Sequence, residues 1–264
     1  MKTKIYALPG FLGLPSDWDI IGEGIGEPWE AVELFSLSHP KYGLQCWGRA
    51  LNHYVAQQSV SRRILMGYSQ GGRLGMHALI DAPELWAGAI MVSAHTGLIL
   101  EKERSSRLRS DERWAQRFLK DPWEVLINDW NCQTVFRIGA LPPQRKERDY
   151  VRSDLACAIQ SWSIGRQGNL RGALSQLTLP LLWIAGEKDF KYVALSQQIA
   201  VDHFYSLFWI APEVGHRVPW ESPQLFSKKV KLWLQRTEAF PCSQNCYLEK
   251  IGGNFSGNSR CSLI

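Results

Sequence analysis

Three residues with catalytic side chains, Ser69, Asp189 and His216, each follow a short apolar run of the sequence. A serine hydroxyl is a weak base and nucleophile by itself, but an imidazole can take its proton while a carboxylate fixes the imidazole tautomer. Because parallel strands share their carboxyl edge, residues at three strand ends can meet there. Each residue alone has an ordinary explanation, such as a helix cap for Asp189 or a turn for His216. Together, in this chain order, they predict a Ser-His-Asp triad.

The serine lies in a tight turn between a predicted strand and a predicted helix. Gly67 and Gly71 flank Ser69 in the sequence Gly-Tyr-Ser-Gln-Gly. A turn this sharp strains the backbone, so the neighbouring residues must lack side chains that would collide. The backbone N–H of Gln70 would lie at a helix N-terminus, where it can face a developing oxyanion. The alternative is a glycine-rich turn with an idle serine.

A second loop offers another backbone donor. The first predicted strand, 5–8, ends in the sequence Pro-Gly-Phe-Leu-Gly at 9–13. A glycine-containing loop after an early strand can place a second oxyanion donor beside the nucleophile, here the N–H of Phe11. A plain strand-ending turn is the alternative.

Alternating strands and helices are needed to position these residues. The apolar periodicity predicts an α/β fold in which a mostly parallel sheet is flanked by helices. The Gly-x-Ser-x-Gly turn and the chain order Ser69, Asp189, His216 resemble those of the α/β-hydrolase fold. A charged, helical stretch at about 98–175 interrupts the pattern and predicts a cap over the strand ends. We expect one domain over 1–240 and a disordered tail over 241–264, which is polar and rich in Gly, Ser and Asn. Strands are expected at 5–8, 29–35, 64–66, 86–92, 179–185 and 206–210, and helices at 44–57, 72–80, 101–120, 122–130, 148–164 and 224–234.

The composition of the chain narrows the class of function. Among 264 residues, 30 Lys and Arg face 25 Asp and Glu, a mild net charge of +5 that forms no basic block. This balance does not favour a nucleic-acid partner and suits a small anionic substrate. The six cysteines form neither a disulfide framework nor a zinc motif, so we expect no metal and no cofactor. With no signal peptide and no long apolar run, we expect a cytoplasmic protein without a membrane partner. Monomer and homo-oligomer both stay open.

Three arginines indicate the chemistry of the substrate. Arg73 lies one helical turn beyond Ser69, so its side chain can reach the same pocket, and Arg107 and Arg152 belong to the predicted cap. Any one of them could be an ordinary surface residue. A guanidinium binds a carboxylate through two hydrogen bonds, whereas an apolar ester needs no such partner. The arginines therefore predict a small-molecule polycarboxylate substrate.

Several segments together resemble one enzyme family. They include Gly-Tyr-Ser-Gln-Gly-Gly-Arg at 67–73, Arg-Leu-Arg-Ser-Asp-Glu-Arg-Trp-Ala at 107–115, Leu-Ile-Asn-Asp-Trp at 126–130 and Gly-His at 215–216. Over residues 5 to about 235 the chain resembles the 2-succinyl-6-hydroxy-2,4-cyclohexadiene-1-carboxylate synthases of menaquinone and phylloquinone biosynthesis. It departs from them where Arg217 follows Gly-His, since the family commonly has Asn there.

The resemblance implies a lyase. It would eliminate pyruvate from 2-succinyl-5-enolpyruvyl-6-hydroxy-3-cyclohexene-1-carboxylate and give 2-succinyl-6-hydroxy-2,4-cyclohexadiene-1-carboxylate, with the triad acting as a base. Two alternatives stay open: a serine esterase or C–C bond hydrolase that uses Ser69 covalently, and a ligand receptor on the same fold. The implied site consists of a triad (Ser69, Asp189, His216), two oxyanion donors (Phe11, Gln70) and substrate-binding side chains (Tyr68, Arg73, Arg107, Trp130, Arg152).

Overall fold

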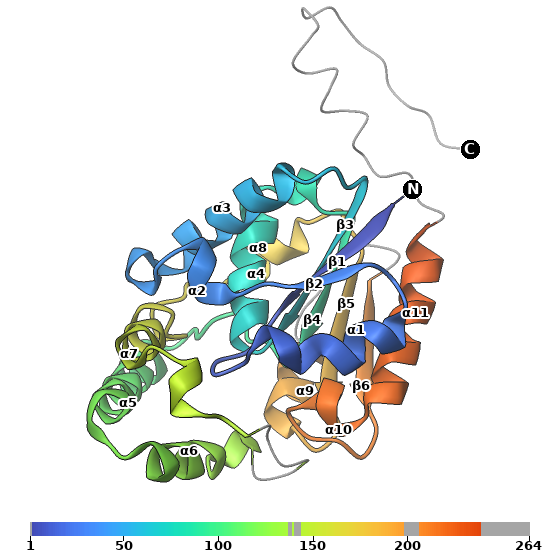
Figure 1. Ribbon diagram of the computed structural model, residues 1–264. Coiled ribbons are helices and arrows are strands. Elements are labelled where there is room, and N and C mark those ends of the chain that lie inside the picture. The colour runs from blue at the N-terminus through green and yellow to red at the C-terminus, as the bar shows by residue number, and fades with distance from the viewer. Residues whose placement is uncertain (1, 137–138, 140–143, 198–205, 239–264) are drawn as a thin grey trace, which may run out of the picture.

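Within the described part of the chain, six parallel strands form one sheet at the centre of the molecule. The structure is a computed structural model that describes residues 2–136, 139, 144–197 and 206–238. The strand order is β2-β1-β3-β4-β5-β6, and every neighbouring pair is parallel, which confirms the expected sheet (Figure 1). The strands are β1 (Thr3–Leu8), β2 (Trp29–Ala31), β3 (Arg62–Tyr68), β4 (Gly88–Val92), β5 (Leu181–Gly186) and β6 (Leu207–Ala211).

Helices cover both faces of this sheet. On one side lie α3, α4 and α8, and on the other lie α1 and α11 (Figure 1). The α-helices are α1 (Asp19–Ile25), α2 (Leu34–Leu37), α3 (Gly43–Ala56), α4 (Gln70–Asp81), α5 (Glu101–Lys120), α6 (Trp123–Asn131), α7 (Arg152–Ser161), α8 (Arg171–Ser175), α9 (Phe190–Gln197), α10 (Val218–Glu221) and α11 (Pro223–Glu238). No helix in the described part of the chain is both long and apolar enough to cross a membrane.

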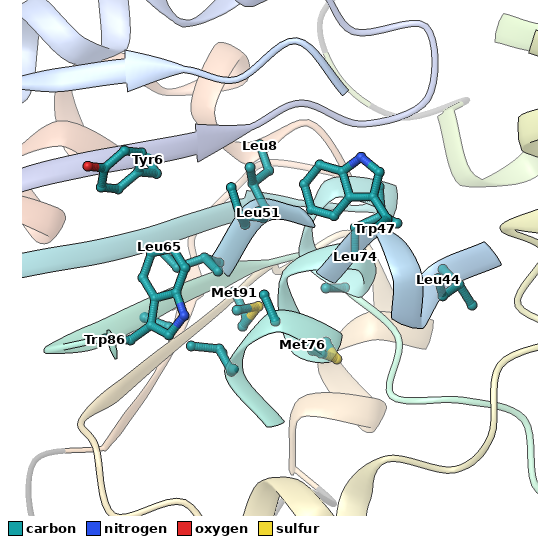
Figure 2. Packing of buried hydrophobic residues seen from close by; sticks show 14 of the residues in the cluster. Tyr6, Leu8, Leu44, Trp47, Leu51, Leu65, Leu74, Met76, Trp86 and Met91 are labelled. Atoms are coloured by element: carbon teal, nitrogen blue, oxygen red, sulfur yellow. The ribbon is translucent and has the colours of Figure 1, made fainter. Parts of the chain in front are cut away.

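Alternate side chains of each strand enter two separate cores. In β3, Leu65 joins the cluster beneath α3 and α4, whereas Ile64 and Met66 join the cluster beneath α1 and α11. Figure 2 shows the first of these clusters, with Trp47 of α3 and Leu74 of α4 packed together. Because both faces of the sheet are covered, the strands read as continuous apolar runs rather than as alternating ones.

A helical stretch separates β4 from β5. Helices α5, α6 and α7 lie together at one end of the molecule (Figure 1), and they share a third apolar cluster that includes Phe118, Leu126 and Leu155. Phe11 and Leu12, from the loop after β1, pack into this same cluster. The helices therefore rest on the loop that carries the second expected oxyanion donor. The predicted tail over 241–264 lies outside the described residues.

One predicted strand is wrong in its second half. The expected strand over 29–35 ends at Ala31, and the short helix α2 follows it. The Glu33 side chain accepts the N–H of Phe35 at 3.2 Å, and Ser36 Oγ donates to the Glu33 carbonyl at 2.8 Å. Such local side-chain bonds favour a helix start over a continued strand.

Candidate active site

The turn at Ser69 needs the glycines that flank it. Ser69 has a φ of 50°, a left-handed conformation that is rare outside glycine. A Cβ on Gly71 would lie 2.3 Å from the carbonyl oxygen of Pro9, and a Cβ on Gly67 would lie 2.5 Å from the Cα of Gly72. The close approach of β1, β3 and α4 therefore excludes side chains there, and it raises the serine at the strand end.

The three residues of the predicted triad meet beyond the ends of their strands. His216 Nε2 lies 3.3 Å from Ser69 Oγ, and His216 Nδ1 lies 2.6 Å from Asp189 Oδ2. His216 and Asp189 are buried, whereas Ser69 is partly exposed to the cavity. This arrangement lets the imidazole bridge a hydroxyl and a carboxylate, as proton transfer from the serine requires.

Hydrogen bonds on both sides hold the loop that carries His216. The Glu221 carboxylate accepts the N–H of Gly215 at 2.6 Å and that of Arg217 at 2.9 Å. Ser93 Oγ donates to the His216 carbonyl at 2.9 Å. The sequence analysis did not predict these supporting roles, because the hydrogen-bond partners of Glu221 and Ser93 depend on how their loops fold. They fix the imidazole from its backbone.

The two expected oxyanion donors line the same cavity as Ser69. Among the described residues, neither the N–H of Phe11 nor that of Gln70 has a hydrogen-bond acceptor. Gln70 is the first residue of α4, where backbone N–H groups have no partner within the helix. A Cβ on Gly10 would lie 2.8 Å from the Tyr68 ring, so the loop after β1 comes very close to the turn that carries Ser69.

Aromatic side chains enclose the cavity, whose volume is about 160 Å³. Tyr68 and Trp130 both line it, and the Trp130 ring lies 4.8 Å from that of Phe11. Burial raises the pKa of the Tyr68 hydroxyl far above its usual value, so Tyr68 is neutral at physiological pH. Tyr192 also lines the cavity and lies 4.7 Å from the His216 ring.

Arg73 brings a buried positive charge to this cavity. Its Nη1 donates to Gln167 Oε1 at 3.1 Å and its Nη2 to the Trp162 carbonyl at 2.7 Å. Among the described residues, no carboxylate lies within 4.0 Å of the guanidinium nitrogens. Burial, and then the nearby charge of Arg107, lowers the pKa of Arg73 to about 10. The group is still charged at neutral pH, but it has lost much of its hydration.

Arg107 lines the cavity as well, from helix α5. Its Nε lies 2.8 and 2.9 Å from the two oxygens of Asp111, one helical turn further along. Asp111 is buried and Arg107 is partly exposed. The carboxylate therefore orients the guanidinium of Arg107 toward the cavity.

Arg152 does not line the cavity, so the structure does not bring it together with the other predicted residues. Its Nη2 donates to the Asp121 carbonyl, its Nη1 lies 3.5 Å from Glu147 Oε1, and its guanidinium packs over the Trp123 ring. It joins the start of α6 to the start of α7. The direction of this long side chain depends on these tertiary contacts, which the sequence does not display.

Arg217, which the sequence analysis noted only as a departure from the family, lines the cavity. Its guanidinium carbon lies 4.2 Å from the centre of the Phe136 ring, and its Nη2 donates to Asn131 Oδ1 at 2.8 Å. Burial lowers the pKa of Arg217. The only sequence signal was its position directly after the histidine.

The stretch that precedes α7 is hydrogen-bonded to the segment that carries Phe11. Arg145 donates two hydrogen bonds to Asp17, at 2.9 and 2.7 Å, and both side chains are largely buried. The Tyr150 hydroxyl donates to the Leu12 carbonyl at 2.8 Å. The stretch around 144–150 thus holds the segment that carries Phe11 through side-chain hydrogen bonds.

The described residues offer no metal site. No group of three or more His, Cys, Asp or Glu side chains within them could hold a metal ion.

Comparisons with known proteins show the family of the chain. The model of the Alpha/beta hydrolase family matches residues 5–229. The 2-succinyl-6-hydroxy-2,4-cyclohexadiene-1-carboxylate synthase of Salmonella arizonae is 34% identical over 230 residues, 82% of this chain and 87% of that protein. The synthase of the same name from Photorhabdus laumondii is 33% identical over 215 residues, 73% of this chain and 75% of that protein.

Solved structures share the fold. MenH from S. aureus has a TM-score of 0.74 at 20% identity, covering 90% of this chain and 94% of its own. A thermophilic esterase from Thermogutta terrifontis has a TM-score of 0.66 at 16% identity, covering 89% and 90%. The resemblance predicted from the sequence is confirmed: the chain belongs to the alpha/beta hydrolase family and, within it, to the family of the 2-succinyl-6-hydroxy-2,4-cyclohexadiene-1-carboxylate synthases.

Proposed function

We propose that the protein is a carbon–oxygen lyase, a 2-succinyl-6-hydroxy-2,4-cyclohexadiene-1-carboxylate synthase that eliminates pyruvate. The observation that carries this proposal is Arg73, a buried guanidinium that lines the same cavity as Ser69 and has neutral hydrogen-bond partners. A desolvated cation is stabilised by an anionic ligand, and the substrate of such a synthase carries three carboxylates. The relatives that bear this name support the assignment.

The proposed reaction begins with proton abstraction. His216, oriented by Asp189, takes the proton of Ser69 Oγ, and the oxygen removes the ring proton next to the succinyl carbonyl. The negative charge moves to the carbonyl oxygen, which accepts hydrogen bonds from the N–H groups of Phe11 and Gln70. A preorganised pair of donors lowers the energy of this enolate.

The elimination then moves electrons around the ring. The enolate collapses to form the C2=C3 double bond, the electrons of C3=C4 move to C4=C5, and the C5–O bond breaks. The leaving group departs as the enolate of pyruvate and takes up one proton, which balances the proton removed from C2. No water and no redox partner take part.

The arginines distinguish this proposal from its main alternative. A serine esterase or C–C bond hydrolase would use the same Ser69 as a covalent nucleophile. A neutral ester would not stabilise the charged, desolvated Arg73 in the cavity that it shares with the serine, whereas a substrate carboxylate would.

Pyruvate release measures the proposed function directly. The enolpyruvyl substrate is supplied, and pyruvate is followed through a coupled dehydrogenase for the wild type, Ser69→Ala and the control Ser105→Ala. Ser105 is on α5, outside the cavity, and its Oγ donates to Glu101. We expect release that Ser69→Ala abolishes and Ser105→Ala retains. No release above the enzyme-free rate, together with ester turnover that depends on Ser69, would instead establish a hydrolase.

A further inference from the structure

In the described part of the chain, the tyrosines of the cavity wall differ from the other buried or half-buried tyrosines. Tyr6, Tyr54 and Tyr150, which lie outside the cavity, each donate a hydrogen bond to another residue. Tyr68 and Tyr192 line the cavity, and neither hydroxyl has a hydrogen-bond partner among the described residues. A tyrosine withdrawn from bulk water normally bonds its hydroxyl. Neither oxygen is sealed inside the protein, so both are open to a ligand in the cavity.

Tyr192 is positioned by two residues of the predicted triad. It lies in the first turn of α9, where its N–H donates to the Asp189 carbonyl at 2.9 Å. The centre of its ring lies 4.7 Å from that of the His216 ring and 6.2 Å from that of the His95 ring. The backbone bond and the two ring contacts together fix this aromatic side chain beside the imidazole of His216.

The Tyr192 hydroxyl also lies within electrostatic reach of two arginines of the cavity wall. Burial, and then the negative charge of Asp189, raises the pKa of Tyr192 to about 12, while the positive charges of Arg107 and Arg73 oppose this rise. A phenol with such a pKa keeps its proton at physiological pH. The side chain therefore offers a neutral O–H donor in the same part of the cavity as these guanidinium groups.

The hydroxyl of Tyr192 is not needed to fill the cavity wall. A phenylalanine ring would occupy the same space and would leave no polar oxygen to satisfy. Water can bond to the hydroxyl as long as no ligand is bound. A substrate that displaces this water must supply a partner, because otherwise the unpaired hydroxyl opposes binding. A tyrosine at this position therefore favours a substrate that places an oxygen next to it.

We propose that Tyr192 is a specificity-determining residue whose hydroxyl donates a hydrogen bond to the same substrate carboxylate that Arg73 binds. This inference rests on the proposed function, because that function supplies the carboxylate. A carboxylate has two oxygens, so it can accept from a guanidinium and from a hydroxyl at the same time. Two donors from different helices, α4 and α9, would fix the direction of the carboxylate and thereby align the substrate with Ser69.

The test compares Tyr192→Phe, which removes the hydroxyl alone, with the wild type. Tyr54→Phe is the matched control, because it is the same substitution outside the cavity, where the Tyr54 hydroxyl donates to Glu30. The kinetics of pyruvate release and urea unfolding are measured for each protein. The two readouts separate a hydroxyl that binds substrate from one that supports the fold.

We expect Tyr192→Phe to lower kcat/KM about 10-fold or more, mainly through a higher KM, as for loss of a hydrogen bond to a charged group. Its free energy of unfolding should equal or exceed that of the wild type, since no protein partner is lost. Tyr54→Phe should show the reverse: unchanged kinetics and lower stability. Kinetics of Tyr192→Phe within about threefold of the wild type, or a fall in kcat with KM unchanged, overturn the inference. A destabilised Tyr192→Phe variant overturns it too, because the hydroxyl would then have a partner in the protein.

A double-mutant cycle tests whether Tyr192 and Arg73 bind the same carboxylate. In an Arg73→Met background that carboxylate has already lost its main partner, so adding Tyr192→Phe should lower kcat/KM by less than about threefold. The full loss of about 10-fold in that background would show two independent sites and overturn the inference. A wild type that releases no pyruvate contradicts the proposed function whatever the variants do. An active wild type with an unaffected Tyr192→Phe variant contradicts only this inference.

Discussion

Replacing Arg73 by Met should separate stability from activity. The guanidinium of Arg73 is buried, and burial lowers its pKa from the usual value of a guanidinium to about 10. One pKa step corresponds to about 1.4 kcal/mol, so the charged form is disfavoured by about 3 kcal/mol in the folded protein. The sign is unfavourable, because a cation whose pKa is lowered on folding destabilises the fold at every pH below the folded value.

Two opposing terms set the stability of Arg73→Met. The substitution removes the penalty of about 3 kcal/mol, but it leaves the Trp162 carbonyl and Gln167 Oε1 without their donor, which costs about 1 to 3 kcal/mol for each acceptor. The two terms partly cancel. We therefore expect the free energy of unfolding in urea, followed by tryptophan fluorescence, to change by less than about 3 kcal/mol.

Activity should respond much more strongly. Loss of a desolvated partner for a substrate carboxylate lowers transition-state binding by about 2 to 4 kcal/mol, or kcat/KM for pyruvate release by about 30- to 1,000-fold. Arg62→Met is the control, because Arg62 is equally buried, bonds to Thr3 and Thr237, and lies outside the cavity. If Arg73→Met keeps kcat/KM within threefold, Arg73 does not bind substrate. If it instead loses more than about 4 kcal/mol of stability, the reasoning about its burial is wrong.

Three further predictions follow from the same region. Gly71→Ala should prevent stable folding or lower the melting temperature sharply, because its Cβ would lie 2.3 Å from the carbonyl oxygen of Pro9; a melting temperature equal to the wild type would contradict this. Glu221→Gln should lower kcat about 10-fold or more with little change in KM, since one N–H beside His216 loses its charged acceptor, and an unchanged kcat would show that the loop needs no such support. Burial lowers the pKa of His95 to about 3, so the folded protein keeps this side chain neutral over most of the acidic range. The unfolded chain protonates His95 as the pH falls below about 6.5, so the free energy of unfolding decreases from there toward pH 3. Between pH 7.5 and 5 the wild type should lose about 2 kcal/mol more unfolding free energy than His95→Gln, and equal losses would contradict the assignment.

The sequence predicted those parts of the molecule that depend on local pattern and topology. The helix expected over 101–120 has the same bounds in the structure, because its charged and apolar residues recur at helical spacing without an interrupting glycine or proline. The meeting of Ser69, Asp189 and His216 followed from the rule that parallel strands share a carboxyl edge. Neither prediction needed a knowledge of side-chain packing.

The directions of long side chains could not be predicted in this way. Arg152 is a cap residue by sequence, yet it bonds to the Asp121 carbonyl rather than facing the cavity. Arg217 was noted only as a departure from the family, yet it lines the cavity wall. An arginine spans many rotamers, and the choice among them depends on partners distant in the chain. The side-chain cap at Glu33, which ended the predicted strand, was local but lay within a run of strand-like residues.

The hydrogen bonds of Arg145 and Tyr150 have a consequence for substitutions far from Ser69. These two residues bond to Asp17 and to the Leu12 carbonyl, and Arg145 also lines the cavity. The stretch that carries them and the segment that carries Phe11 are therefore one hydrogen-bonded unit. A substitution that removes either contact disturbs the wall of the cavity and the Phe11 loop together, although it lies outside the predicted triad.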